Sequence, residues 1–327
     1  MIEITPEAIF SIQNPLEFEE MALAVFQYQA KENVVYKSFI EHLGIDPSQV
    51  DNLLDIPFLP IEFFKTQRIL SNTSEIIETF SSSGTTGMQQ SKHYITDLTW
   101  YEQSFLKAFE LFYANPNNYI ILALLPSYLE RDGSSLIYMC EHLIRKSEDE
   151  RSGFYLNEFD KIKSIIEENN AEKQVLLIGV TYALLDFAEQ CPFPMENCII
   201  METGGMKGKR REMLREEVHL QLTQAFQVKQ IHSEYGMTEL LSQAYSNGNG
   251  IFRTPPWMKI LIRETNDPFS YYNYNRSGGI NIIDLANVNS CAFIATQDLG
   301  KTHPDERFEV LGRFDNADVR GCNLLVQ

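Results

Sequence analysis

Short apolar runs alternate with amphipathic segments between residues 94 and 231, and no other feature limits the fold of this chain as strongly. Predicted buried strands lie at 119–125, 175–179, 198–201 and 228–231. Predicted helices lie at 97–113, 158–169, 181–190 and 207–226. This alternation predicts an α/β fold with a doubly wound, largely parallel sheet, in which ligands bind at the carboxyl ends of the strands.

The segments on either side of this region follow different patterns. Residues 1–80 are predicted to be a helical and loop-like N-terminal segment of the core, and residues 81–250 form the α/β core itself. After residue 250, short apolar runs are joined by turns rich in Asn, Asp and Gly, and no helical period intervenes. Residues 251–327 are therefore predicted to be a β-rich subdomain that closes one side of the site.

Composition and charge exclude several classes of partner. The formal net charge of −18 repels nucleic-acid backbones and anionic lipids. No apolar stretch reaches the roughly 20 residues needed to span a bilayer, and no signal peptide is visible. Five cysteines without C-x-x-C spacing argue against a disulfide framework and against a thiolate zinc site. We expect a reduced, cytoplasmic protein that binds neither nucleic acid nor membrane.

The strongest local signal is a loop in which every residue carries a hydroxyl group or no side chain. Its members are Ser81, Ser82, Ser83, Gly84, Thr85, Thr86 and Gly87. Glycines let the backbone aim its N–H groups inward, and the hydroxyls add further donors, which suits the oxygens of a polyphosphate. The segment matches neither the Walker A motif nor G-x-G-x-x-G. On composition alone, a flexible linker remains the alternative.

Three further motifs follow the loop in order: YGMTE at 235–239, TQD at 296–298 and GRFD at 312–315. Together the four motifs resemble those of the adenylate-forming ligases, which include acyl-CoA synthetases and the adenylation domains of peptide synthetases. Within that superfamily, PSYLERDGSS at 126–135, TGGMKG at 203–208 and RGC at 320–322 resemble the acyl-protein synthetases of bacterial bioluminescence fatty-acid reductases. Phenylacetate–CoA ligases are also similar. The resemblance covers roughly residues 55–327.

The resemblance implies ATP and Mg²⁺ as cofactors and assigns residues to them. Residues 81–87 would hold the β- and γ-phosphates, so that residues 81–250 form a nucleotide-binding core. Tyr235, followed by Gly236, would pack on the adenine, and Thr238 would contact a phosphate. Glu239 would bind Mg²⁺, which prefers oxygen ligands from one or two carboxylates and from substrate phosphates. Outside a motif, a core aromatic and a solvated acid would be the simpler interpretations of Tyr235 and Glu239.

The resemblance also assigns the ribose and the acyl side of the site. Asp298 would accept both ribose hydroxyls, and Arg313 would reach the same sugar. Turn chemistry is the alternative for Asp298. Gly204 and Gly205 would lie against the adenine and the acyl pocket, although a strand-to-helix turn explains them equally well.

The implied reaction activates a carboxylic acid, a fatty acid by this resemblance, as an acyl-adenylate and transfers the acyl group to a thiol. The acceptor is open between the chain's own Cys322, a carrier protein, a partner reductase and coenzyme A, and the protein could be a homo- or hetero-oligomer. Cys322 could also be a small buried apolar residue. The chain ends soon after Arg313, so we expect no separate C-terminal lid domain.

Other functions remain open at this stage. The alternatives are an acyl-CoA ligase, a nucleotide-binding subunit without chemistry, and an acyltransferase that uses a preformed acyl-adenylate or thioester. The basic cluster at 207–211 could bind a phosphate group, or it could be a solvated face that pairs with Glu212, Glu216 and Glu217.

Overall fold

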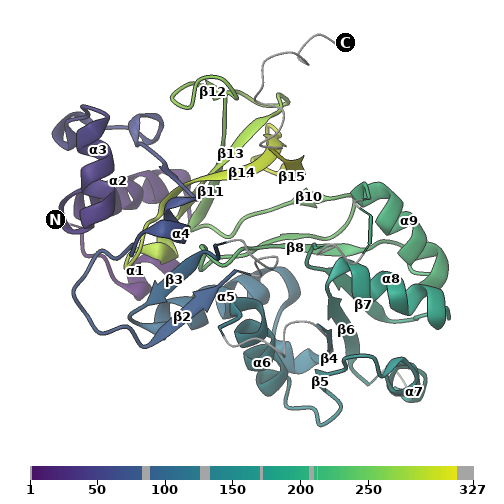
Figure 1. Cartoon of the computed structure of the whole chain (residues 1–327). Helices are drawn as coiled ribbons and strands as arrows, with labels where there is room; N and C mark the ends of the chain where they lie inside the picture. The colour runs from purple at the N-terminus through teal and green to yellow at the C-terminus, as the bar shows by residue number, and fades with distance from the viewer. Residues whose placement is uncertain are drawn as a thin grey trace.

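The apolar runs of the α/β core assemble into a six-stranded sheet (Figure 1). The computed structural model describes residues 2–82, 89–125, 133–169, 172–205, 210–211 and 213–314. The strand order is β5 (Gly153–Phe154), β4 (Tyr119–Leu124), β6 (Gln174–Gly179), β7 (Cys198–Glu202), β8 (His232–Tyr235) and β9 (Ala244–Ser246). The first five strands are parallel, and β9 pairs antiparallel with β8. Every residue of β4 is buried, as expected for a parallel strand covered on both faces.

Helices cover both faces of this sheet (Figure 1). They are α5 (Leu98–Tyr113) and α6 (Ser135–Ser147) on one face, and α7 (Phe159–Glu168), α8 (Thr181–Gln190) and α9 (Arg215–Phe226) on the other. Tyr101 of α5 stacks on Tyr138 of α6 at a centroid distance of 5.9 Å. On the other face, the ring centroid of Phe187 in α8 lies 4.9 Å from that of Phe159 and 5.2 Å from that of Phe226. Phe187 therefore packs α8 against both α7 and α9. The predicted doubly wound α/β core is therefore confirmed.

Two predicted elements were placed wrongly. The strand predicted at 228–231 is instead β8 at His232–Tyr235. The helix α9 ends at Phe226, the next residue Gln227 is left-handed (φ 51°), and the chain turns there before it enters the sheet. The helix predicted from residue 207 begins at Arg215. Its N-cap, Leu214, is extended, and Arg210 lies in irregular backbone where it pairs with Asp186 and Glu189 of α8.

The C-terminal part of the described chain forms a second, mostly antiparallel sheet. Its order is β10 (Ile251–Phe252), β15 (Phe308–Arg313), β14 (Phe293–Thr302), β13 (Gly278–Asp284), β11 (Met258–Arg263) and β12 (Tyr271–Tyr272). A seventh strand, β1 (Leu59–Pro60), comes from the N-terminal segment and pairs parallel with β14. The N-terminal segment thus contributes directly to the sheet that carries two of the candidate nucleotide contacts.

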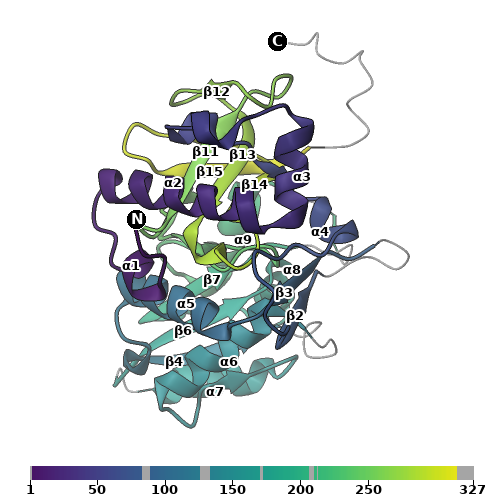
Figure 2. The same cartoon turned by 90° about the vertical axis from the view of Figure 1, so that its left-hand side faces the viewer.

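Helices of the N-terminal segment lie partly on this second sheet and partly against other elements, and the first of them contacts α5 (Figure 2). They are α1 (Pro6–Phe10), α2 (Pro15–Glu32), α3 (Val34–His42) and α4 (Phe63–Thr66). Asn14 caps α2 by accepting two backbone hydrogen bonds of 3.1 Å, and a proline follows it at the first helical position. Phe26 of α2 meets Phe293 of β14 at a centroid distance of 6.0 Å.

A two-stranded hairpin and short 3-10 helices complete the described structure. The hairpin joins β2 (Glu78–Ser81) to β3 (Lys92–Ile95) in antiparallel register. The 3-10 helices are η1 (Pro47–Gln49), η2 (Leu53–Asp55), η3 (Pro116–Asn118) and η4 (Leu285–Asn287). The hairpin therefore carries the candidate phosphate loop between its two strands.

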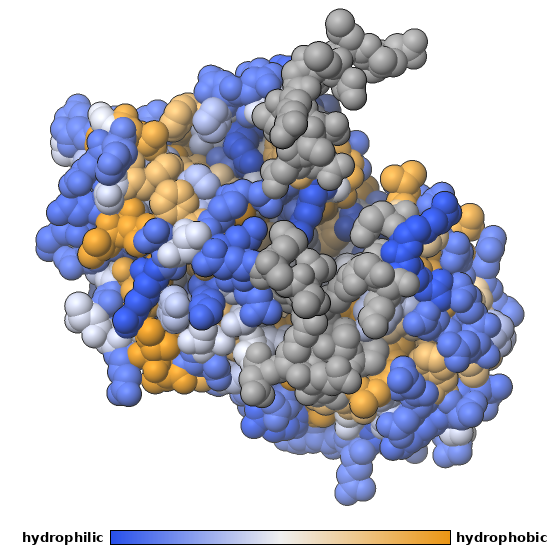
Figure 3. Space-filling view, in the orientation of Figure 1, coloured by the Kyte–Doolittle hydropathy of each residue, from blue (hydrophilic) through white to orange (hydrophobic). Residues whose placement is uncertain are grey.

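One face of the molecule shows how polar and apolar side chains are distributed on its surface. Figure 3 shows a face that is mostly hydrophilic, on which apolar side chains lie in separate groups. Among the residues that the structure describes, no helix has the length and hydropathy required to cross a membrane.

Candidate nucleotide and metal site

The base of the Ser/Thr/Gly loop is closed by reciprocal hydrogen bonds between its two sides. Ser82 N donates to the carbonyl oxygen of Ser91 at 3.0 Å, and Ser91 N donates to Ser82 Oγ at 2.9 Å. Ser81 N donates to the carbonyl of Gly133 at 2.7 Å, which ties the loop to the segment before α6. The remaining loop positions, Ser83, Gly84, Thr85, Thr86 and Gly87, lie outside the described residues. The described base fixes where the loop leaves the hairpin.

Glu239 lies against this base. The side chain follows β8 and is buried, with a relative exposure of 6%. Burial raises the pKa of its carboxyl group, while a hydrogen bond with Ser91 and the positive charges of Arg313 and Lys65 act in the opposite direction. The candidate metal carboxylate is therefore in contact with the residue that closes the candidate phosphate loop.

Glu239 is a suitable ligand for Mg²⁺ that would need further ligands from a substrate. Within the described parts of the chain, no group of three or more His, Cys, Asp or Glu side chains could hold a metal ion. Mg²⁺ commonly binds through one or two carboxylates plus substrate phosphates, and a single buried carboxylate beside a phosphate loop fits that pattern.

Three candidate nucleotide contacts from distant parts of the sequence meet beside β8. Tyr235, the last residue of β8, donates its hydroxyl hydrogen to Asp298 Oδ2 at 2.8 Å. Arg313 donates from Nε to Asp298 Oδ1 at 3.0 Å, and these two residues are directly opposite each other on β14 and β15. Burial first, and then the Asp298 charge, raise the pKa of Tyr235 well above its ordinary value, so its hydroxyl remains a donor. The Arg313 side chain is 76% exposed and faces solvent.

The glycines near the site have two different structural reasons. Gly204 and Gly205 follow β7 with φ values of 74° and 92°, in the left-handed region that favours glycine. Gly204 N donates to Glu202 Oε2 at 2.7 Å. Gly236 differs, because a Cβ atom there would meet Glu234 Oε1, so that a larger residue would require the Glu234 side chain to move. The backbone at the carboxyl ends of β7 and β8 therefore carries glycines, without side chains, at Gly204, Gly205 and Gly236.

Two buried acids at these strand ends were missed by the sequence analysis. Burial opposes ionisation of Glu202, but hydrogen bonding with His219 and the charge of Arg215 outweigh it and hold the pKa at about 2. Glu234 has the opposite environment, since burial and the charge of Glu202 raise its pKa to about 8. An acid at the end of an apolar strand segment was the available sequence signal for Glu202, whereas the strand of Glu234 is not apolar and gave no such signal.

A buried histidine was missed as well. His93 of β3 contacts, from its place on the hairpin, the segment that contains Thr238. Its Nδ1 is 2.9 Å from the carbonyl oxygen of Thr238, and its Nε2 is 2.8 Å from Ser290 Oγ. A lone histidine in a short strand gives no sequence signal of such a role.

Two further predictions have different outcomes. Cys322 lies outside the described residues, so its role as an acyl acceptor stays a prediction. Within the basic cluster, Arg210 pairs with Asp186 and with Glu189, and the Arg210–Glu189 distance is 2.6 Å. The charge of Arg210 is thus already compensated by α8.

Comparison with known proteins agrees with the arrangement of these motifs. Residues 7–100 match the family model described as acyl-protein synthetase, LuxE. The chain is 24% identical over 343 aligned residues to the long-chain-fatty-acid–luciferin-component ligase of Vibrio harveyi, covering 91% of this chain and 84% of that protein. This chain is similar to the LuxE acyl-protein synthetases. The resemblance inferred from the motifs is confirmed, and the similarity extends into the N-terminal residues, to which the motifs gave no weight.

Solved structures show the same fold at low sequence identity. A 2-hydroxyisobutyryl-CoA ligase in complex with 2-HIB-AMP and CoA matches with a TM-score of 0.66 and 12% identity, covering 92% of this chain and 70% of that chain. ATP-bound MatB from Rhodopseudomonas palustris matches with a TM-score of 0.55 and 14% identity over 74% of this chain. The match spans 49% of the MatB chain, about half its length. These likenesses confirm the α/β fold predicted from the alternating pattern.

Proposed function

We propose that this chain activates a fatty acid with ATP and Mg²⁺ as an acyl-adenylate and transfers the acyl group to a thiol. One observation carries the proposal. Ser91, which closes the base of the loop with Ser82, contacts Glu239. The hydrogen bonds that join Tyr235 and Arg313 to Asp298 lie at the same end of β8. Described residues of the four sequence motifs thus lie near the carboxyl edge of a parallel sheet, where α/β proteins bind ligands. The names of its relatives support the same reaction class.

Each group has a role in the first half-reaction. The loop at 81–87 binds the terminal phosphates, and Glu239 holds Mg²⁺, which neutralises charge on the triphosphate. Asp298 accepts the ribose hydroxyls, and Tyr235 and Arg313 fix its carboxylate. The fatty-acid carboxylate attacks the α-phosphorus, a new P–O bond forms, and pyrophosphate leaves with the electrons of the broken bond. Catalysis of this step depends on positioning and on charge stabilisation.

The second half-reaction consumes the mixed anhydride. A thiolate attacks the acyl carbon, a thioester forms, and AMP leaves. The acceptor is a protein thiol, either Cys322 of this chain or that of a carrier or partner reductase. Coenzyme A is the second candidate, because the structurally similar 2-hydroxyisobutyryl-CoA ligase is seen in complex with CoA.

Pyrophosphate exchange into ATP tests the first half-reaction. The purified chain should exchange labelled pyrophosphate only when Mg²⁺ and a carboxylic acid are present, and most strongly with long-chain fatty acids. Glu239→Gln should abolish the exchange, whereas Glu216→Gln, at an exposed position of α9, should leave it unchanged. Equal exchange by Glu239→Gln and wild type would remove Glu239 from the reaction. Adding coenzyme A and looking for free acyl-CoA separates the two acceptors.

A further inference from the structure

We propose that Ser91, directly before β3, and His93 of β3 are positioning residues that set Thr238 and Glu239 relative to the candidate phosphate loop. The inference rests on the proposed function and adds residues that no motif contains. Residues two apart in an extended segment point to the same side, so Ser91 and His93 both face the segment after β8. Ser91 reaches the side chain of Glu239, and His93 reaches the backbone of Thr238.

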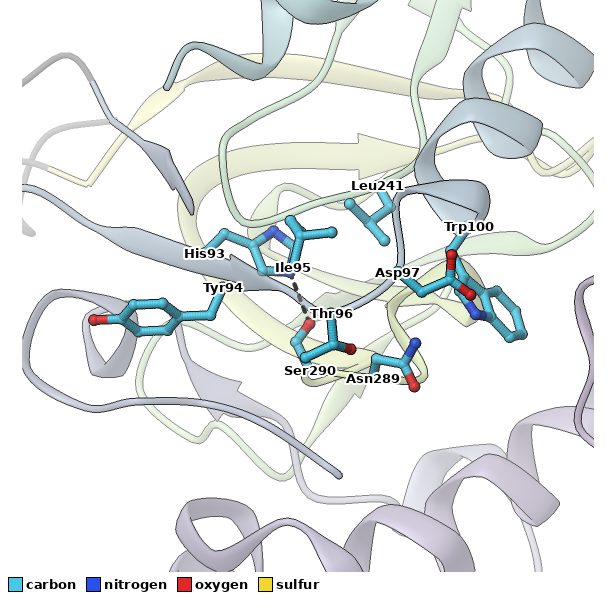
Figure 4. Close-up of a pocket in the computed structure, with 9 residues that line it drawn as sticks. All are labelled: His93, Tyr94, Ile95, Thr96, Asp97, Trp100, Leu241, Asn289 and Ser290. Carbon is cyan, nitrogen blue, oxygen red and sulfur yellow. Dashed lines mark hydrogen bonds between the residues drawn. The ribbon is translucent and has the colours of Figure 1, made fainter. Parts of the chain in front are cut away.

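The hydrogen bonds of His93 define its tautomer. A carbonyl oxygen can only accept, so Nδ1 carries the proton and donates it to Thr238. Nε2 then accepts the hydroxyl hydrogen of Ser290, an interaction drawn in Figure 4. His93 is 1% exposed, and its ring packs edge-to-face with Phe64 at a centroid distance of 5.6 Å. Burial lowers its pKa to about 4, which keeps this neutral form in place at physiological pH.

Other side chains fix the remainder of the same segment. Asn287 Nδ2 donates to the carbonyl oxygen of Glu239 at 2.8 Å. Asp284 Oδ2 accepts from the backbone nitrogens of Leu241 at 2.9 Å and Ser242 at 3.0 Å. These contacts attach the segment to the β-rich sheet and η4. Ser91 and His93 attach it to the hairpin that carries the phosphate loop.

This division of contacts predicts a selective effect. Without the His93 donor, residues 238–239 remain attached to η4 and β13 but are no longer aligned with the loop. A displacement of about 1 Å at a catalytic group is enough to reduce a rate by about 100-fold. The loss should therefore appear in the binding and use of Mg·ATP, while the Michaelis constant for the fatty acid stays unchanged.

Two amide variants separate the contacts of the ring. In His93→Asn, the amide nitrogen is two bonds from Cβ, as Nδ1 is, and can still donate to Thr238. In His93→Gln, the amide lies one bond further out, near the position of Nε2, and loses that donor. We expect His93→Gln to weaken Mg·ATP binding by about tenfold or more and His93→Asn to stay within about threefold of wild type. Ser290→Ala, which removes only the Nε2 contact, should also stay within about threefold.

Calorimetric binding of Mg·ATP is the primary measurement, because it requires no turnover. If no acid supports pyrophosphate exchange by the wild type, the proposed function fails, while the calorimetric comparison still decides the role of His93. Equal binding by the two amide variants, or weaker binding by His93→Asn, would overturn the proposal. If His93→Gln does not fold, Ser91→Ala should weaken Mg·ATP binding and Ser91→Thr should restore it. Unchanged binding by Ser91→Ala would then overturn the proposal.

Discussion

Replacing Glu234 with Gln should change how the stability of the protein depends on pH. Glu234 lies at the end of β8, where burial and the charge of Glu202 raise its pKa from an ordinary value of 4.5 to about 8. The folded protein therefore keeps a proton on this carboxyl group that the unfolded chain releases above its ordinary pKa. The contribution of Glu234 to the unfolding free energy is fully present below the pKa of this group in the unfolded chain. It is lost as the pH rises through the pKa of the group in the folded protein.

The size of the effect follows from the two pKa values. Each unit of difference corresponds to about 1.4 kcal/mol, so Glu234 should cost the wild type about 3 to 4 kcal/mol of unfolding free energy between about pH 5 and about pH 8. Gln has a similar shape and no charge, so Glu234→Gln should be close to wild type at the lower pH and several kcal/mol more stable at the higher pH. That is a large fraction of the stability of a typical domain.

Urea unfolding at several pH values measures this difference. The unfolding free energy of Glu234→Gln minus that of wild type should increase steadily with pH. Glu216→Gln, at an exposed position of α9, serves as the control and should show a flat difference. A flat or falling difference for Glu234→Gln would refute the argument, because it would mean that the folded protein does not hold the proton.

Two further substitutions test the contacts at the site. Tyr235→Phe removes the 2.8 Å hydrogen bond to Asp298. Because hydrogen bonds to charged groups contribute about 1.5–3 kcal/mol, this variant should raise the Michaelis constant for ATP in pyrophosphate exchange by about tenfold. An unchanged Michaelis constant would show that Tyr235 has no role in nucleotide binding. Gly236→Ala places a methyl group against Glu234 Oε1 and should lower the unfolding free energy by about 1–3 kcal/mol. Combining Gly236→Ala with Glu234→Gly should recover part of that loss in a thermal melt, and an additive loss would contradict the steric explanation.

The alternation of strands and helices was sufficient to predict the α/β core, because buried parallel strands are continuous apolar runs. The same rule misplaced β8, whose sequence His-Ser-Glu-Tyr is not apolar. Glu234 in this strand is buried and its pKa is raised. A hydropathy pattern cannot predict a buried strand that contains an acidic residue. The pairing of β1 with β14 was equally hidden, since a two-residue strand has no period of its own.

The candidate site was predictable only in part. Tyr235 lies 63 residues before Asp298 and 78 residues before Arg313. Only a family resemblance linked these residues before the structure placed them in contact. His93 could not have been found in that way, because its role depends on the carbonyl oxygen of Thr238, which is a backbone group and has no signature in the sequence. Contacts to backbone groups therefore require coordinates.

Direct detection of the intermediate is the most decisive measurement. The chain should be incubated with Mg²⁺, a long-chain fatty acid and ATP labelled at the α-phosphate, without any thiol acceptor. We expect a fatty acyl-AMP to form, with release of pyrophosphate, and expect none from Glu239→Gln. Formation of ADP in place of the acyl-adenylate, or no labelled product from a chain that binds Mg·ATP normally, would contradict the account.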